Sequence, residues 1–143
     1  MIEMTDKFKI LSTYVKDLSS ETPNVESYIY TKDNISKYEL DIDINSIALK
    51  NKFIEINTKL KFQDKTQVEK KSYFEIIYAT IIKIEDDIKE KKDLQKIILC
   101  DVQNKIFPNL EKILIRVLED SGFPGIKFDK KIDFTKLFNE KFN

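Results

Sequence analysis

The residue types that most often carry enzyme chemistry are missing or scattered in this sequence. Its 143 residues include no histidine, which excludes His-activated nucleophiles, His-ligated metals and the commonest general base. The one cysteine, Cys100, lies in an apolar helical pattern without an activating base, so we expect a buried, unreactive thiol. Two pairs of adjacent acids, Asp86 with Asp87 and Glu119 with Asp120, are interpreted as solvated charges. We therefore expect no enzymatic activity, no cofactor and no metal site.

The length of 143 residues predicts a single domain covering residues 1–143. Lys and Arg together number 25, as do Asp and Glu, so bulk charge does not predict nucleic-acid binding. The sequence contains no signal-peptide core and no apolar run long enough to span a bilayer, and a lone cysteine suits a reducing compartment. We expect a cytoplasmic protein without direct membrane insertion.

Binding rather than catalysis is indicated by large apolar residues in segments that read as irregular. One such segment follows Pro23 and another separates the C-terminal helices. Loops are usually more polar, so these residues either fold over the core as lids or line an apolar groove that binds a partner. The candidate groove residues are Tyr28, Tyr30, Ile35, Phe123, Ile126, Phe128 and Ile132.

Two kinds of periodicity predict the elements that must position these residues. Segments 8–17, 38–44, 52–63 and 72–84 alternate apolar and polar residues with period two, which predicts strands. The connections after the second and third are short enough for an antiparallel sheet.

From residue 93 onward, apolar residues recur at three- and four-residue steps, which predicts amphipathic helices. We expect a break between Asn104 and Pro108, a stop at Gly122, and a last helix capped by Asp133. The fold class is therefore α+β, a four-stranded antiparallel sheet followed by helices packed on one face.

The fourth predicted strand has apolar side chains on both faces. Phe74, Ile76 and Tyr78 lie on one face, while Ile77 and Ile81 lie on the other. An antiparallel sheet normally exposes one face to water, so a second apolar face predicts additional cover. Contact with another subunit is the preferred interpretation, and a central strand under its own helices is the alternative.

Several short segments resemble the SecB family of bacterial protein-export chaperones. The segments YVKDLS (14–19), IFP (106–108), GFP (122–124) and IDF (132–134) are similar to family segments in the same order. The resemblance implies a dimer of dimers, with helices between two outer sheets. It also implies that Phe74, Ile76 and Tyr78 face the tetramer interface.

By the same resemblance, the chain is expected to be an ATP-independent holdase. It would bind unfolded preproteins in apolar grooves and deliver them to the translocation motor SecA. The positions that match the SecA-binding face are Asp17, Glu21, Tyr73 and Glu75. Two alternatives stay open: a SecB-like chaperone dedicated to a toxin-antitoxin system, and a monomeric carrier of a small apolar ligand.

Overall fold

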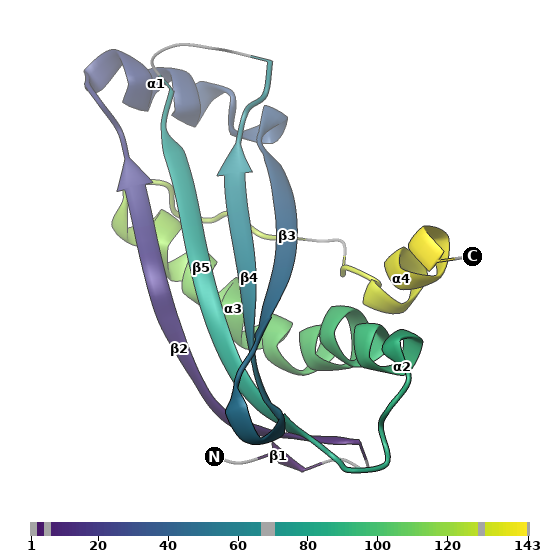
Figure 1. Cartoon of the computed structure of the whole chain (residues 1–143). Helices are drawn as coiled ribbons and strands as arrows, with labels where there is room; N and C mark the ends of the chain where they lie inside the picture. The colour runs from purple at the N-terminus through teal and green to yellow at the C-terminus, as the bar shows by residue number, and fades with distance from the viewer. Residues whose placement is uncertain (1–2, 5–6, 67–70, 129–130, 143) are drawn as a thin grey trace.

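A computed structural model describes residues 3–4, 7–66, 71–128 and 131–142. Four long strands form an antiparallel sheet (Figure 1), as the alternation predicts, and a two-residue strand is added at one edge. The order across the sheet is β1-β2-β5-β4-β3, so the first long strand pairs with the last. The strands are β1 (Glu3–Met4), β2 (Phe8–Glu21), β3 (Glu39–Ala48), β4 (Phe53–Gln63) and β5 (Tyr73–Ile84).

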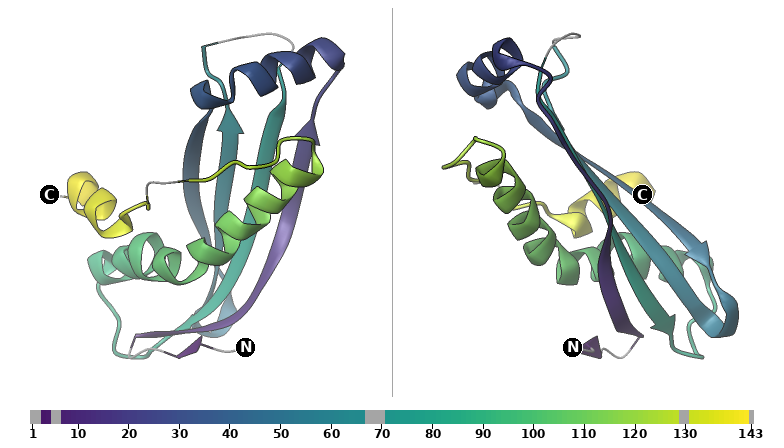
Figure 2. Two further views of the ribbon diagram at one scale, coloured as in Figure 1. Left: turned by 180° about the vertical axis from the view of Figure 1, so that it is seen from behind. Right: turned by 90° about the vertical axis from the view of Figure 1, so that its left-hand side faces the viewer.

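Helix α3 (Val102–Asp120) packs across one face of this sheet (Figure 2). Its buried residues Leu110, Leu114 and Leu118 belong to the same core cluster as Ile56 and Leu60 of β4. The expected α+β arrangement is therefore confirmed. In the described part of the chain, none of the helices has the length and apolar character needed to cross a membrane.

The inner face of β5 is closed within the chain itself. Phe74 and Ile76 are 0% exposed and Tyr78 is 4% exposed. They face the helical side of the sheet, on the side that the alternation predicts. These three side chains, expected at a tetramer interface, leave almost no area for a second copy to contact, because the chain's own helices and loops already cover them.

The path of the main helix differs from the expectation at Pro108. Helix α3 runs through Pro108 without a break. The irregularity comes earlier, in a π-helical turn (Ile97–Asp101) that follows α2 (Lys91–Lys96). Pro108 has no backbone N–H to donate to the carbonyl of Asn104, four residues earlier. Asn104 is exposed, so water can hydrogen-bond to that carbonyl instead. The last helix, α4 (Phe134–Phe142), is capped by Asp133 as predicted, with Lys136 N donating to Oδ1 at 3.0 Å.

The segment after Pro23, expected to be irregular, forms helix α1 (Val25–Asp33). Its N-cap is Asn24, whose Oδ1 accepts a hydrogen bond from Ser27 N at 2.9 Å. The helix carries no clear apolar stripe, so periodicity could not reveal it. Short 3₁₀ turns follow at Ile35–Lys37 and, between β3 and β4, at Lys50–Lys52.

Candidate functional site

A surface cavity of about 390 Å³ lies between α1 and the segment that follows α3. We call it the α1 groove. Both walls stand on the side of the sheet that carries α3, as the right-hand view of Figure 2 shows. Four of the seven predicted groove residues line it, namely Tyr28, Ile35, Phe123 and Ile126. The complete lining is Tyr28, Lys32, Ile35, Gly122, Phe123, Pro124 and Ile126.

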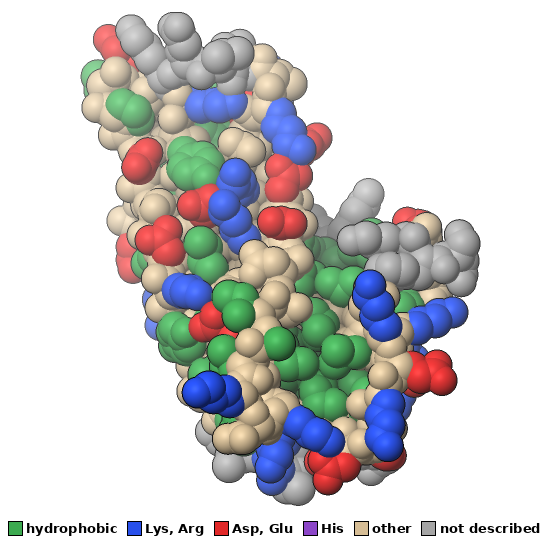
Figure 3. All heavy atoms as spheres, in the orientation of Figure 1, with side chains coloured by type: hydrophobic (Ala, Val, Ile, Leu, Met, Phe, Trp, Pro, Cys, Tyr) green, Lys and Arg blue, Asp and Glu red, His purple; other side chains and the backbone are tan. Residues whose placement is uncertain are grey.

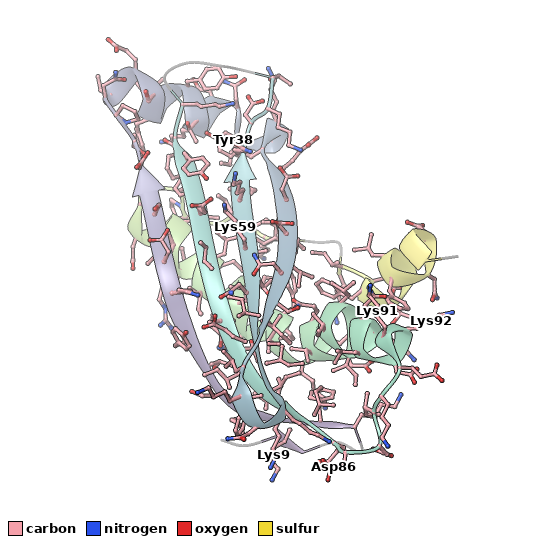
Figure 4. The ribbon with its side chains drawn as sticks, viewed as in Figure 1. Lys9, Tyr38, Lys59, Asp86, Lys91 and Lys92 are labelled. Carbon is pink, nitrogen blue, oxygen red and sulfur yellow. The ribbon has the colours of Figure 1, made fainter. Side chains whose placement is uncertain are left out.

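The α1 wall is held in place by buried polar contacts. The Ser72 backbone N–H donates to Thr31 Oγ1 at 2.9 Å, and the Tyr38 hydroxyl donates to the Ser72 carbonyl. Thr31 and Ser72 are 0% exposed, so these hydrogen bonds form out of contact with water, where a broken one is costly. Figure 4 labels Tyr38 beneath α1 at this end of the sheet.

Tyr30 does not line the groove, because its side chain contacts the segment that follows β4. Its hydroxyl donates to Asp64 Oδ2 at 2.8 Å, beyond the end of β4. The hydrogen bond from the Thr66 hydroxyl is the main cause that lowers the pKa of Asp64, against the effect of burial. Residues two apart on a helix diverge by roughly 200°, which explains why Tyr28 reaches the groove and Tyr30 does not.

The second wall begins where α3 ends. Phe123 N donates to the Leu118 carbonyl at 2.8 Å, and Gly122 adopts a positive φ of 97°. This is the glycine stop that the sequence predicts. The Phe123 ring then packs edge-on against Phe74 with ring centroids 5.6 Å apart, and Phe123 is only 4% exposed. This aromatic residue thus belongs to both the core and the groove.

The two walls touch at Tyr28. Its hydroxyl donates to the Gly122 carbonyl at 2.9 Å, and its ring lies 5.1 Å from that of Phe123. A Cβ at position 122 would lie 2.9 Å from Tyr28 Cε1. Glycine is therefore required here by close approach as well as by φ.

The last two predicted groove residues lie farther along the chain. Phe128 packs edge-on against Phe62, with centroids 5.5 Å apart. Ile132 lines two different hollows, one beside Pro108 and one between β3 and α4. The structure thus keeps four of the seven predicted residues in the α1 groove and places Tyr30, Phe128 and Ile132 elsewhere.

An apolar hollow beside β3 was not identified as a site in the sequence. Figure 3 shows apolar side chains gathered between β3 and helices α2 and α4. Part of it is a cavity of about 210 Å³. In the sequence, the residues that line this cavity read only as the apolar positions of an amphipathic strand and of amphipathic helices, which gives no sign of a site. The apolar lining residues are Ile42, Ile44, Leu99, Phe134, Leu137 and Phe138.

The residues expected to bind SecA lie together on the outer face of the sheet. Glu21 pairs with Tyr73, Ser19 with Glu75, and Asp17 with Ile77 across β2 and β5. All four candidates therefore occupy the end of the sheet nearest α1.

Glu75 is ion-paired within the chain. Its Oε1 lies 3.2 Å from Lys59 Nζ and 4.0 Å from Lys61 Nζ, and accepts the Tyr73 hydroxyl at 2.8 Å. Burial raises the pKa of Glu75, but the hydrogen bond from Tyr73 and the charge of Lys59 outweigh it and keep the pKa below its usual value. Burial and the hydrogen bond to Glu75 raise the pKa of Tyr73 to about 12. Figure 4 labels Lys59 on this face.

A second polar cluster, which the sequence did not reveal, crosses three strands nearer the middle of the same face. Tyr14 donates to Glu55 Oε1 at 2.6 Å, and Lys16 Nζ lies 3.2 Å from Glu55 Oε2. The Tyr14 hydrogen bond is the largest cause of a lowered Glu55 pKa. Tyr14 is in register with Ala79, which is 0% exposed. The chain's own side chains thus cover part of the second apolar face.

Among the residues that the structure describes, no three His, Cys, Asp or Glu side chains are placed to hold a metal ion together. Cys100 is a buried free thiol, with Sγ 3.1 Å from Thr135 Oγ1. The surfaces described above offer apolar contact and charge pairing.

Comparison with known sequences gives matches over nearly the whole chain. The family "SecB: Preprotein translocase subunit SecB" matches residues 2–143. A protein of Pelagibacter ubique bearing the protein-export SecB name is 54% identical over 140 residues, which cover 98% of this chain and 100% of that protein. The protein-export protein SecB of Parvibaculum lavamentivorans is 28% identical, with coverage of 94% and 79%.

A solved structure shares the fold. It is the Mycobacterium tuberculosis Rv1957 SecB-like chaperone in complex with a ChAD peptide from the Rv1956 HigA1 antitoxin, with a TM-score of 0.57. The alignment covers 88% of this chain and 91% of that one at 8% identity, which supports the fold alone. The family match covers residues 2–143, and the sheet and helices have the fold of the SecB-like chaperone. The chain therefore belongs to the SecB family of protein-export chaperones.

Proposed function

We propose that this export chaperone is a cytoplasmic, ATP-independent holdase that binds unfolded preproteins in the α1 groove and transfers them to SecA. The observation that carries the proposal is the groove itself, in which half-buried Tyr28, Ile35 and Ile126 offer apolar surface next to the core. Binding of unfolded chains lowers the concentration free to fold or aggregate, by mass action. No catalytic step is needed.

Weak individual contacts suffice if one client spans several grooves. An unfolded preprotein exposes apolar segments at intervals along its chain. After one segment binds, the next binds intramolecularly, and avidity can exceed single-site affinity by about 10² to 10⁴. Such avidity requires more than one copy of the groove in each assembly.

A dimer of dimers would supply those copies, and the β2 edge supports it. β1 pairs with β2 only at Lys9 and Ile10. Beyond them, Val15 and Leu18 of β2 are 42% and 50% exposed. An edge strand with exposed apolar side chains is a ready surface for pairing with another chain. We therefore propose that the chain assembles as a homotetramer.

Transfer to SecA would use the outer face. Asp17 and Glu21 are exposed there, and no ion pair to a described residue involves either of them. Glu75, in contrast, is neutralised by lysines. We propose that Asp17 and Glu21 carry the attraction to SecA, while Tyr73 and Glu75 form the surface between them.

Export is favoured over a toxin-antitoxin role. The SecB-like chaperone solved with an antitoxin peptide is only 8% identical to this chain. The relative at 54% identity is an export protein by name. A monomeric carrier of an apolar ligand would bind lipid and lack the avidity described above.

An aggregation assay tests the client site. Ile126→Asp places a charge in the groove and is expected to reduce protection of a reduced, aggregating protein severalfold, because desolvating a carboxylate opposes apolar contact. The matched control is Val25→Asp on α1, since Val25 is 66% exposed and outside the groove lining. Light scattering on the same samples is expected to give about four chains. Equal protection by both variants at unchanged circular dichroism would contradict the assignment.

A further inference from the structure

The α1 groove carries the charge of a single side chain. Among the described residues that line it, only Lys32 is ionised at neutral pH, and the others are apolar, aromatic or glycine. Lys32 follows Tyr28 by four residues on α1, so the two side chains lie on the same face of the helix. A client segment that packs against Tyr28 is therefore brought next to an ammonium group.

The fold does not use this ammonium group. No hydrogen bond or ion pair to another described residue involves Lys32 Nζ, and Lys32 is exposed. A lysine in the last turn of a helix can hydrogen-bond the terminal carbonyls. Here Asn34 does so, because its backbone N–H and its Nδ2 donate to the Tyr30 carbonyl at 2.9 Å and 2.8 Å. Lys32 is left available to a ligand.

An ammonium group at an apolar groove can set the preference among client segments. Apolar contact supplies most of the affinity, but it distinguishes poorly between apolar segments, and a few polar groups provide the selectivity. A carboxylate beside the apolar side chain of a client would accept a charge-assisted hydrogen bond from Lys32. A client lysine or arginine at the same place would meet a like charge.

We propose that the α1 groove selects client segments in which an aspartate or glutamate lies beside a large apolar side chain, and that Lys32 determines this specificity. The inference rests on the proposed function of the same groove and names the class of segment it takes. Because Lys32 is exposed, each charge effect is modest. Attraction of acidic segments and repulsion of basic ones add, so we expect affinities about three- to tenfold apart.

Three short peptides test the preference. They share one apolar sequence, are blocked at both ends and carry the same fluorescent label, and they differ only in having Asp, Asn or Lys beside a central Phe. Blocking removes the terminal carboxylate, so only the side-chain charge varies. Fluorescence anisotropy should give the tightest binding for the Asp peptide and the weakest for the Lys peptide, and high salt should reduce the difference.

Two substitutions assign the preference to Lys32. Lys32→Gln should bring the three affinities within about twofold of one another and leave the affinity for the Asn peptide unchanged. Lys32→Glu should reverse the order. The matched control is Lys37→Glu, which makes the same change of charge on an exposed turn outside the groove lining and should keep the wild-type order.

The outcomes separate this inference from the proposed function. Equal affinities of wild type for the three peptides, or a preference that survives in Lys32→Gln, would overturn the selectivity and leave the client site intact. If wild type bound none of the three peptides, the selectivity would also fail. The aggregation assay with Ile126→Asp and Val25→Asp then decides the client site independently.

Discussion

The two faces of β5 are built from one alternating sequence and yet serve different purposes. The inner face carries Phe74 and Ile76 at 0% exposure beneath the chain's own helices. The outer face carries Tyr73, Glu75 and Ile77, all half-buried among charged neighbours. The inner face therefore determines stability, and the outer face retains enough polar surface to meet a partner. Residues of the inner face hold the fold together, and residues of the outer face are free to dock.

The largest expected effect is on the free energy of unfolding. It compares two adjacent residues of β5, Ile76 on the inner face and Ile77 on the outer face. Ile76→Ala should lower the free energy of unfolding by about 2–5 kcal/mol, because it leaves a cavity in a closed core. Ile77→Ala removes the same atoms from a half-buried position and should cost about 1–2 kcal/mol. Urea denaturation of both variants measures the difference.

The same pair shows whether another chain covers the outer face. If Ile77→Ala were as destabilising as Ile76→Ala, the outer face would be buried in the assembly, and the division between the faces would fail. Repeating the denaturation at several protein concentrations distinguishes the cases, because the midpoint depends on protein concentration only when unfolding is coupled to the separation of subunits.

The strands and their faces were predictable because a period of two is short and each strand repeats it several times. Asp17, Glu21, Tyr73 and Glu75 were grouped through the family resemblance, and strand register does bring them together. Ion pairing of Glu75 was not predictable, since it depends on Lys59 of a neighbouring strand. Sequence pattern cannot supply such cross-strand distances.

The groove was harder to predict than the sheet. Helix α1 gave no periodic signal, because its anchoring contacts are polar side chains such as Thr31 rather than an apolar stripe. Without the helix, the opposite directions of Tyr28 and Tyr30 could not be assigned. Phe128 and Ile132 share the composition of groove residues, but their positions depend on the path of a segment without regular structure.

The next effect in size concerns docking on the outer face. Asp17→Lys reverses an exposed charge and should weaken SecA binding roughly threefold to tenfold, mainly through slower association. Glu75→Lys is less suitable, because it would place a third ammonium group beside Lys59 and Lys61 and disturb the sheet itself.

Surface plasmon resonance at low and physiological salt measures this effect. The control is Asp87→Lys in the turn that follows β5, at the opposite end of the sheet, where an equal change in net charge should matter little. Equal weakening by both variants would show that SecA responds to total charge rather than to this face.

The smallest expected effect is the coupling between Tyr73 and Glu75 on the outer face. A double-mutant cycle with Tyr73→Phe and Glu75→Gln should give a coupling energy of about 0.5–1 kcal/mol at pH 8.

The Tyr73 pKa is raised to about 12, above roughly 10 in the unfolded chain. The folded state thus holds this proton more tightly, and the stability linked to it is present below pH 10 and lost between about pH 10 and 12. Urea midpoints between pH 8 and 11 should show the coupling shrinking as pH rises. If the coupling energy did not change with pH, packing of the Tyr73 ring, and not the hydrogen bond from its hydroxyl, would couple Tyr73 to Glu75.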